Sequence, residues 1–420
     1  IRERYRDRLN RRFALLQDPQ MPHCRDLAIA HRMMVMFGPE SPTPEVYAWL
    51  QPLSSILGWN GGDEGQAVAQ LSRAGHILLP CNWSMNLGAL SAGSDAWNGG
   101  GQFRSLDPRQ IQFDDGKHAV AFIMSDGDNV QWLMGAFCGH PDYWASPDHG
   151  RFPIGWGAAL GCLDQCSPDT LAYLKQTQRP EATIIQHGGG YFYPDLLGIE
   201  RGPDVRRRIL TEHARRVNHY LRRSGGRTYQ FIMMNLESPG AREAYGIFAR
   251  ELEDLLGMFA LQYHPYEAGN GKVFWIPNGR GDEVPVVTAK YSLWADMPAS
   301  KARAGAPAKI ARAINADARA HTNALLHAWC VTHAWSVFPA SAAPDEPDHT
   351  STSARNGHRA VTPTRWALEQ LDPSVKVVSP EELVWRLRWT HAPDRTAAQI
   401  QQTTPPARAE LVPHQAASQR

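Results

Sequence analysis

The chain has 420 residues, of which 43% are hydrophobic and 20% charged, so it is long enough to bury a large core. Its 43 Lys and Arg residues almost balance its 42 Asp and Glu residues, and this balance gives no reason to expect a nucleic acid or an anionic membrane as partner. Apolar runs such as 119–124 are far shorter than the roughly 18–20 residues that cross a bilayer, so we expect no transmembrane segment.

Residues 1–115 are expected to form a small α/β N-terminal subdomain. Apolar residues at helical spacing predict a helix over 5–16. The segments that follow are predicted as strands over 27–37 and 76–81 and as helices over 44–57 and 66–74. The chain begins at Ile1, without Met and without the apolar stretch of a signal peptide. We therefore expect an incomplete or processed N-terminus and a soluble protein, with a secreted or periplasmic location left open.

From residue 116 to about 390 the pattern of strand, loop and helix repeats. The predicted strands are 118–124, 152–159, 182–187, 228–235, 258–263, 284–290, 324–335 and 374–378. The predicted helices are 168–176, 203–223, 239–256 and 301–320. Several strands are continuous apolar runs, which are typical of a parallel sheet buried on both faces.

Eight such strands predict a (β/α)8 barrel, TIM-like and with room for distortion, as the domain over 116–390. The alternative is an open doubly wound sheet, but no Gly-x-Gly-x-x-Gly follows a first strand. Residues 340–360 read as a long loop. Residues 391–420 are rich in Gln, Ala, Thr and Pro, and we expect them to be a disordered tail.

Polar residues follow the ends of several predicted strands, where barrel enzymes place their active sites. The first strand runs into Ser125-Asp126-Gly127-Asp128-Asn129. Two carboxyl groups and an amide can bind a sugar hydroxyl, hold a hard cation or act as acid and base. The competing interpretation is a turn in which Asp and Asn side chains cap the next helix.

The third strand ends in His187 and the segment Gly188-Gly189-Gly190-Tyr191-Phe192-Tyr193-Pro194. Three Gly residues let the backbone adopt positive φ and approach a ligand closely. In an extended segment Tyr191 and Tyr193 point to one side and Phe192 to the other, so we expect two exposed phenol rings on a buried Phe anchor. The competing interpretation is a tight turn whose aromatic side chains only pack.

Two further strand ends carry candidate residues. Asn235 and Glu237 follow the fourth strand, although a Glu just before a helix is also a common partner of the helix dipole. The repeat around Trp329 and His333 places imidazole and indole rings on one strand face, where a packed aromatic core is an equally good interpretation. Asp296 is the fourth strand-end carboxyl candidate.

The segment 188–194 fits the GxGYxYP signature at every fixed position. Together with Ser-Asp-Gly-Asp-Asn at 125–129 and Leu-Ser-Ser-Ile-Leu-Gly-Trp at 53–59 with the Asp-Glu that follows, it resembles the GxGYxYP family of putative glycoside hydrolases over about residues 20–385. The resemblance implies a barrel-like C-terminal catalytic domain behind small N-terminal subdomains. It supplies neither a substrate nor an assigned nucleophile.

A glycoside hydrolase needs two carboxyl groups, one of them an acid with a raised pKa. We therefore predict Glu237 as general acid and Asp126 or Asp128 as nucleophile or base. The predicted carbohydrate-binding residues are Asn129, Trp156, His187, Gly188, Gly190, Tyr191, Tyr193, Asn235, Trp329 and His333.

Two other functions stay open. One is a metal-dependent carbohydrate deacetylase, although no His-x-x-x-His occurs in the chain. The other is a non-catalytic carbohydrate-binding protein on the same scaffold. The six Cys residues show no zinc-site spacing and are expected to be free thiols, so we predict neither a metal nor a cofactor.

Overall fold

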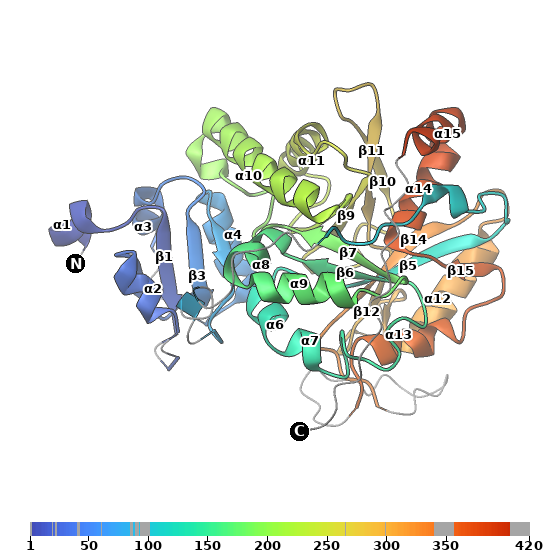
Figure 1. The fold of residues 1–420 in the computed structure, drawn as a ribbon, viewed down its shortest axis with the longest axis horizontal. Coiled ribbons are helices and arrows are strands. Elements are labelled where there is room, and N and C mark those ends of the chain that lie inside the picture. Colours follow the sequence, from blue (N-terminus) through green and yellow to red (C-terminus); the bar gives the residue numbers. More distant parts are fainter. Residues whose placement is uncertain are drawn as a thin grey trace.

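The computed structural model describes residues 2–18, 20–21, 23–39, 43–59, 61–84, 87–88, 92, 101–264, 266–298, 300–339 and 357–403. It is a mixed α/β fold with two sheets, and Figure 1 shows the small N-terminal sheet beside the larger one. None of the described helices combines the length and the apolar character that a membrane span requires.

The N-terminal sheet has four parallel strands in the order β2-β1-β3-β4. Its elements are α1 (Arg2–Tyr5), η1 (Arg6–Arg8), β1 (Phe13–Gln17), α2 (Arg25–Ala30), β2 (Met34–Phe37), α3 (Pro44–Trp49), β3 (Ser55–Trp59), α4 (Glu64–Arg73) and β4 (Ile77–Leu79). The predicted helix over 5–16 is wrong, because Ala14–Leu16 are buried as part of a central strand. The predicted strand over 27–37 is a helix and then a strand, and the predicted helix over 44–57 also divides into α3 and most of β3.

The larger sheet contains eleven strands, ten of them in the order β10-β11-β9-β8-β7-β6-β5-β14-β12-β13, with β15 paired to β5. The strands are β5 (His118–Met124), β6 (Ile154–Ala158), β7 (Ala182–His187), β8 (Thr228–Met233), β9 (Gly257–Gln262), β10 (Val273–Pro277), β11 (Glu283–Thr288), β12 (Tyr291–Leu293), β13 (Ala304–Gly305), β14 (His327–Thr332) and β15 (Val375–Val377). All eight predicted strands are present within a few residues, and β10, β12 and β13 were not predicted.

The helices of this region connect the strands. They are η2 (Pro108–Gln110), α6 (Val130–Met134), α7 (Ala136–Gly139), α8 (Leu160–Cys166), α9 (Pro168–Thr177), η3 (Ile199–Arg201), α10 (Pro203–Ser224), α11 (Pro239–Glu251), α12 (Pro307–Ala320), α13 (Val361–Leu368), α14 (Pro380–His391) and α15 (Pro393–Gln402). The predicted disordered tail is wrong over 393–402, because Thr396 and Ile400 of α15 are buried. Residues 404–420, and 340–356 of the predicted long loop, lie outside the described part of the chain.

A regular (β/α)8 barrel is not confirmed, because the described strands do not pair around a complete ring. The ladder is open at β10 and β13, which gives a curled half-barrel. One bent segment carries both β11 and β12: the Ala289 amide donates to Ala260 of β9, whereas the Lys290 amide donates to Trp329 of β14. The chain itself therefore connects β11 to β12, although no backbone pairing between these two strands closes the sheet.

Candidate functional site

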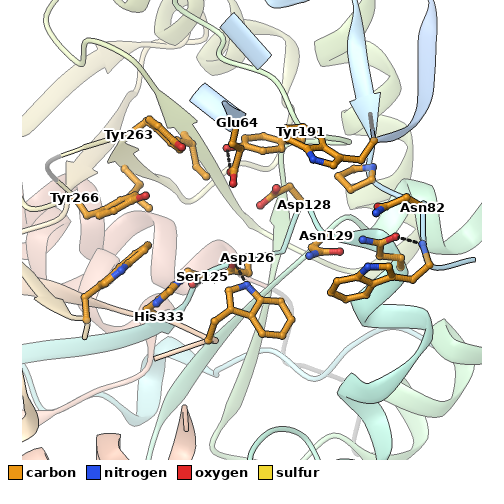
Figure 2. Close-up of a pocket in the computed structure, with 18 residues that line it drawn as sticks. Glu64, Asn82, Ser125, Asp126, Asp128, Asn129, Tyr191, Tyr263, Tyr266 and His333 are labelled. Carbon is orange, nitrogen blue, oxygen red and sulfur yellow. Dashed lines mark hydrogen bonds and ion pairs between the residues drawn. The ribbon is translucent and has the colours of Figure 1, made fainter. Parts of the chain in front are cut away.

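A cavity of about 430 Å³ lies where the N-terminal subdomain meets the carboxyl ends of the large-sheet strands. Its walls come from the last residues of β3, β8 and β9 and from segments after β3, β4, β5, β7, β9, β12 and β14, which is where α/β proteins place their sites. Figure 2 shows Asp126, Asp128 and Glu64 directed into it. The 18 lining residues are Trp59, Glu64, Pro80, Asn82, Trp83, Ser125, Asp126, Asp128, Asn129, Gln131, Tyr191, Ile232, Leu261, Tyr263, Tyr266, Trp294, His333 and Trp335.

The turn after β5 brings two carboxyl groups into the cavity. Asp126 has a positive φ of 61°, which Asp tolerates better than most residues. Its carboxylate accepts a hydrogen bond from the Ser125 hydroxyl and another, 2.5 Å long, from the Trp335 indole N–H. Burial raises the pKa of Asp126, and these two hydrogen bonds oppose that rise.

Asp128 lies deeper, with 6% of its surface exposed. Its Oδ1 makes no hydrogen bond within the described residues, although the His187 Nε2 lies 3.4 Å away. Burial raises the pKa of Asp128 well above its usual value, and the nearby charges of Asp126 and Glu64 add to the rise. Two carboxyl groups two residues apart therefore differ in the hydrogen bonds that they receive.

The sequence analysis did not select Glu64, which opens α4 in the N-terminal subdomain. Its Oε1 accepts a 2.6 Å hydrogen bond from the Tyr191 hydroxyl. Glu64 is exposed as a residue; desolvation of its carboxyl group raises the Glu64 pKa, and the hydrogen bond from Tyr191 opposes that rise. Each subdomain thus contributes carboxyl groups to the same cavity.

The glycine-rich loop serves the junction between the subdomains. Tyr191 and Leu78 of β4 exchange backbone hydrogen bonds, and a Cβ on Gly190 would lie 2.4 Å from Ile77 Cγ2. A Cβ on Gly188 would lie 2.4 Å from the Gly190 oxygen. Neither Gly lines the cavity, so the close approaches that these glycines allow are to other protein atoms.

The three aromatic residues of the signature alternate as expected. Tyr191 and Tyr193 pack in the core that faces the N-terminal sheet, whereas Phe192 packs against His213 in the core around α10 and α11. All three are almost fully buried. Only Tyr191 reaches the cavity, and the Tyr193 hydroxyl lies 3.3 Å from the Tyr191 hydroxyl. The prediction of two exposed phenol rings is therefore wrong.

A stack of three rings forms one wall of the cavity. Tyr266 lies parallel to Trp294 at 3.7 Å, and Trp294 lies parallel to His333 at 3.5 Å between ring centroids. Burial lowers the pKa of His333 to about 3, and its Nδ1 lies 2.7 Å from the Ser336 hydroxyl. His333 therefore lines the site as a neutral ring near neutral pH.

Glu237 and Asn235 do not reach the cavity. Both are exposed after β8, and Glu237 pairs with Lys272 at 2.8 Å. The Lys272 ammonium lowers the Glu237 pKa, whereas a general acid needs a raised one. The fourth strand-end candidate, Asp296, is also exposed and outside the cavity lining. The structure therefore does not place Glu237 where a general acid of this cavity would lie.

Three more predicted carbohydrate contacts are buried outside the cavity. Trp156 packs among the rings of Phe137 and Trp144, and the Trp329 indole donates to the Val287 carbonyl. His187 is 2% exposed, and burial lowers its pKa to about 4. The structure therefore places these three rings in the interior of the protein and not in the cavity wall, and for Trp329 this agrees with the packed-core interpretation.

Five of the residues predicted from the sequence line the cavity together: Asp126, Asp128, Asn129, Tyr191 and His333. The Asn129 side chain also caps α6. The sequence contained a signal for Glu64 and Trp59, because both lie in or shortly after the segment 53–59 that resembles the family. Tyr263 and Trp294 follow strands but carry no local motif, so only the fold reveals them.

Among the described residues, no group of three or more His, Cys, Asp or Glu side chains is placed to hold a metal ion. The six Cys residues are all free thiols. The Sγ atoms of Cys24 and Cys81 lie 3.5 Å apart in the buried centre of the N-terminal subdomain.

Comparison with known proteins gives two matches to family models. The GxGYxYP putative glycoside hydrolase C-terminal domain matches residues 116–388, and the GxGYxYP third domain matches residues 11–92. A comparison with curated proteins finds no match.

The fold is similar to the crystal structure of a putative hydrolase from Bacteroides thetaiotaomicron VPI-5482, with a TM-score of 0.71. The sequences are 18% identical, and the similarity covers 93% of this chain and 69% of that one. At this identity the likeness concerns the fold.

Proposed function

This chain belongs to the GxGYxYP putative glycoside hydrolase family, and from that premise we propose that it hydrolyses a glycosidic bond with Asp128 as general acid and Asp126 as second carboxyl group. The observation that carries the proposal is the contrast between these two side chains in one cavity. Asp126 accepts hydrogen bonds from Ser125 and Trp335, which favour its ionised form. Asp128 is buried with an unbonded Oδ1, which favours its protonated form.

The proposed reaction uses both states. Asp128 gives its proton to the oxygen of the leaving sugar as the glycosidic bond breaks. Asp126 either attacks the anomeric carbon as nucleophile or takes a proton from the water that attacks it. In the first case water then cleaves the glycosyl ester of Asp126 and gives its proton to Asp128, which restores both groups. In the second case the attacking water supplies the hydroxyl of the new reducing end, Asp126 releases the proton of that water to solvent, and Asp128 takes up a proton from solvent. Both carboxyl groups face the cavity, which supports an enzyme over a carbohydrate-binding protein without activity.

Hydrolysis of a glycan panel by the wild type, Asp126→Asn and Asp128→Asn tests the proposal. We expect each variant to lose at least about a hundredfold in turnover, since positioned acid–base groups contribute roughly 10²–10⁴-fold. Glu237→Gln is the matched control, because Glu237 is an exposed strand-end carboxyl outside the cavity, and it should retain full turnover. Full activity in both Asp variants would refute the assignment.

A chelator separates hydrolysis from metal-dependent deacetylation. We expect EDTA to leave turnover unchanged, because the described site offers carboxyl and aromatic groups and no clustered metal ligands. Release of acetate that EDTA stops and a divalent ion restores would instead identify the deacetylase.

A further inference from the structure

The cavity contains one carboxyl group more than the proposed reaction uses. Glycoside hydrolysis needs two, and Asp126 and Asp128 provide them. Glu64 is the third, and it comes from the start of α4 in the N-terminal subdomain, whereas Asp126 and Asp128 follow β5 (Figure 2). The Tyr191 hydroxyl fixes its Oε1 at 2.6 Å, so the carboxyl group is held in position.

The cavity has no positive charge among its described lining residues to balance these carboxyl groups. Neither Lys nor Arg occurs in that lining, and burial keeps its one imidazole, His333, neutral. With Asp128 protonated, Asp126 and Glu64 still leave the cavity negative when ionised. Ionised carboxylates that face one cavity repel each other, and a positive charge that pairs with them relieves this repulsion.

The remaining walls are rich in aromatic rings. Seven of the 18 lining residues are Trp or Tyr, among them Tyr263 and Tyr266 beside the Glu64 side of the cavity. Aromatic faces attract cations and also stack on the apolar faces of sugar rings. Carboxylates together with aromatic rings are the combination that recognises an ammonium group on a ring-shaped ligand.

We propose that the cavity selects glycans whose sugars carry a free amino group, with Glu64 pairing with the ammonium. This inference rests on the proposed function, since it names the substrate class for the same site. An uncharged N-acetyl group cannot pair with Glu64, and a uronic acid would add a further negative charge to the cavity. Glu64 is then a specificity residue that the N-terminal subdomain supplies to the catalytic domain.

Calorimetric binding of three disaccharides tests the proposal. The first consists of two glucosamine units, the second is its di-N-acetylated counterpart, and the third consists of two galacturonic acid units. We expect wild-type protein at pH 7 to bind the amino disaccharide at least tenfold more tightly than the N-acetylated one, and to show no binding of the uronic one. Glu64→Gln should reduce the first ratio to near one. Glu237→Gln, with an exposed carboxyl outside the cavity, should keep the wild-type ratio.

The wild-type protein alone can overturn the inference. It would do so by binding all three ligands with equal affinity or by binding the uronic acid disaccharide most tightly. A tenfold ratio that persists in folded Glu64→Gln protein would remove Glu64 as its cause. Hydrolysis is a separate readout. If amino sugars bind selectively but no glycan is cleaved, the proposed function fails and the selectivity stands; cleavage without selectivity gives the reverse result.

Discussion

At the scale of single residues, the roles that we propose for the two carboxyl groups rest on hydrogen bonding and not on position along the chain. Asp126 and Asp128 follow the same strand and line the same cavity. Two donors reach Asp126, whereas Oδ1 of Asp128 receives none in the described structure. Enzymes use such differences in environment to hold one carboxyl group protonated and the other ionised.

Replacing Asp128 with Asn should not destabilise the protein. Because burial raises the Asp128 pKa, the native state holds the proton more tightly than the unfolded chain. Its contribution to stability is largest below the unfolded pKa of about 3.9 and declines as pH rises toward the folded pKa. Thermal unfolding at pH 5, 7 and 8 should show Asp128→Asn equal to or above wild type, with the difference growing with pH. A lower melting temperature at all three values would indicate a structural role.

Tyr191 and Phe192 are neighbours that face different parts of the protein, so replacing one should affect ligand binding and replacing the other should affect stability. Phe192→Ala leaves a void in the core beside His213 and should destabilise the protein by about 3–5 kcal/mol in urea unfolding. Tyr191→Phe removes one hydroxyl from the cavity wall and should weaken ligand binding by about 0.5–1.5 kcal/mol. A Phe192→Ala variant with wild-type stability would show that this anchor is dispensable.

At the scale of elements, the glycine-rich loop links two sheets. Its backbone pairs with β4 at Leu78, and the positive φ angles of Gly188, Gly189 and Gly190 allow the turn that makes this possible. The loop therefore sets the position of Tyr191, which in turn holds Glu64. A family signature that resembles a ligand loop acts here mainly as a structural joint.

Gly190→Ala tests that joint. The new Cβ would lie 2.4 Å from Ile77 Cγ2 and 3.0 Å from the Leu78 oxygen, so the loop and β4 must separate. We expect destabilisation by more than the roughly 1–3 kcal/mol that strained backbone alone costs, together with weaker binding. Gly116→Ala is the control, because its φ is also positive but nothing lies within 4 Å of the added atom. Equal effects of the two changes would contradict the close packing.

At the scale of the whole molecule, the site exists only where the two subdomains meet. The N-terminal side contributes Trp59, Glu64, Pro80, Asn82 and Trp83, and the strands and loops of the large sheet contribute the other walls. Arg201 holds the two together, because its guanidinium donates to the carbonyls of residues 47, 48, 50 and 74 (Figure 1 shows α3 and α4, which carry or adjoin them).

Arg201→Lys should therefore weaken both the fold and the site. A single ammonium group cannot reach four carbonyls at once as the planar guanidinium does. We expect a loss of about 1.5–3 kcal/mol in urea unfolding and reduced ligand affinity, measured by calorimetry. Arg207→Lys, an exposed α10 residue paired only with Asp204 among the contacts described, should change neither. Unchanged affinity in Arg201→Lys would show that other contacts keep the subdomains in register.

The sequence by itself determined eight of the eleven strands of the large sheet, the family and part of the site. Continuous apolar runs such as 118–124 identify buried parallel strands, because burial on both faces leaves no alternation. Asp126, Asp128 and Tyr191 were found because they lie in local motifs at strand ends. Burial of Trp156, Trp329 and His187 could not be read from the sequence, since core and cavity walls use the same aromatic residue types.

Only the tertiary structure decided which distant residues share the cavity. Glu64 and Asp126 are 62 positions apart, and no periodicity relates a helix start in one subdomain to a strand end in the other. Glu237 looked like the better acid in the sequence, but Lys272 reaches it across the surface and lowers its pKa. The physical reason is the same in each case: local patterns report the neighbours along the chain, whereas protonation and contact depend on neighbours in space.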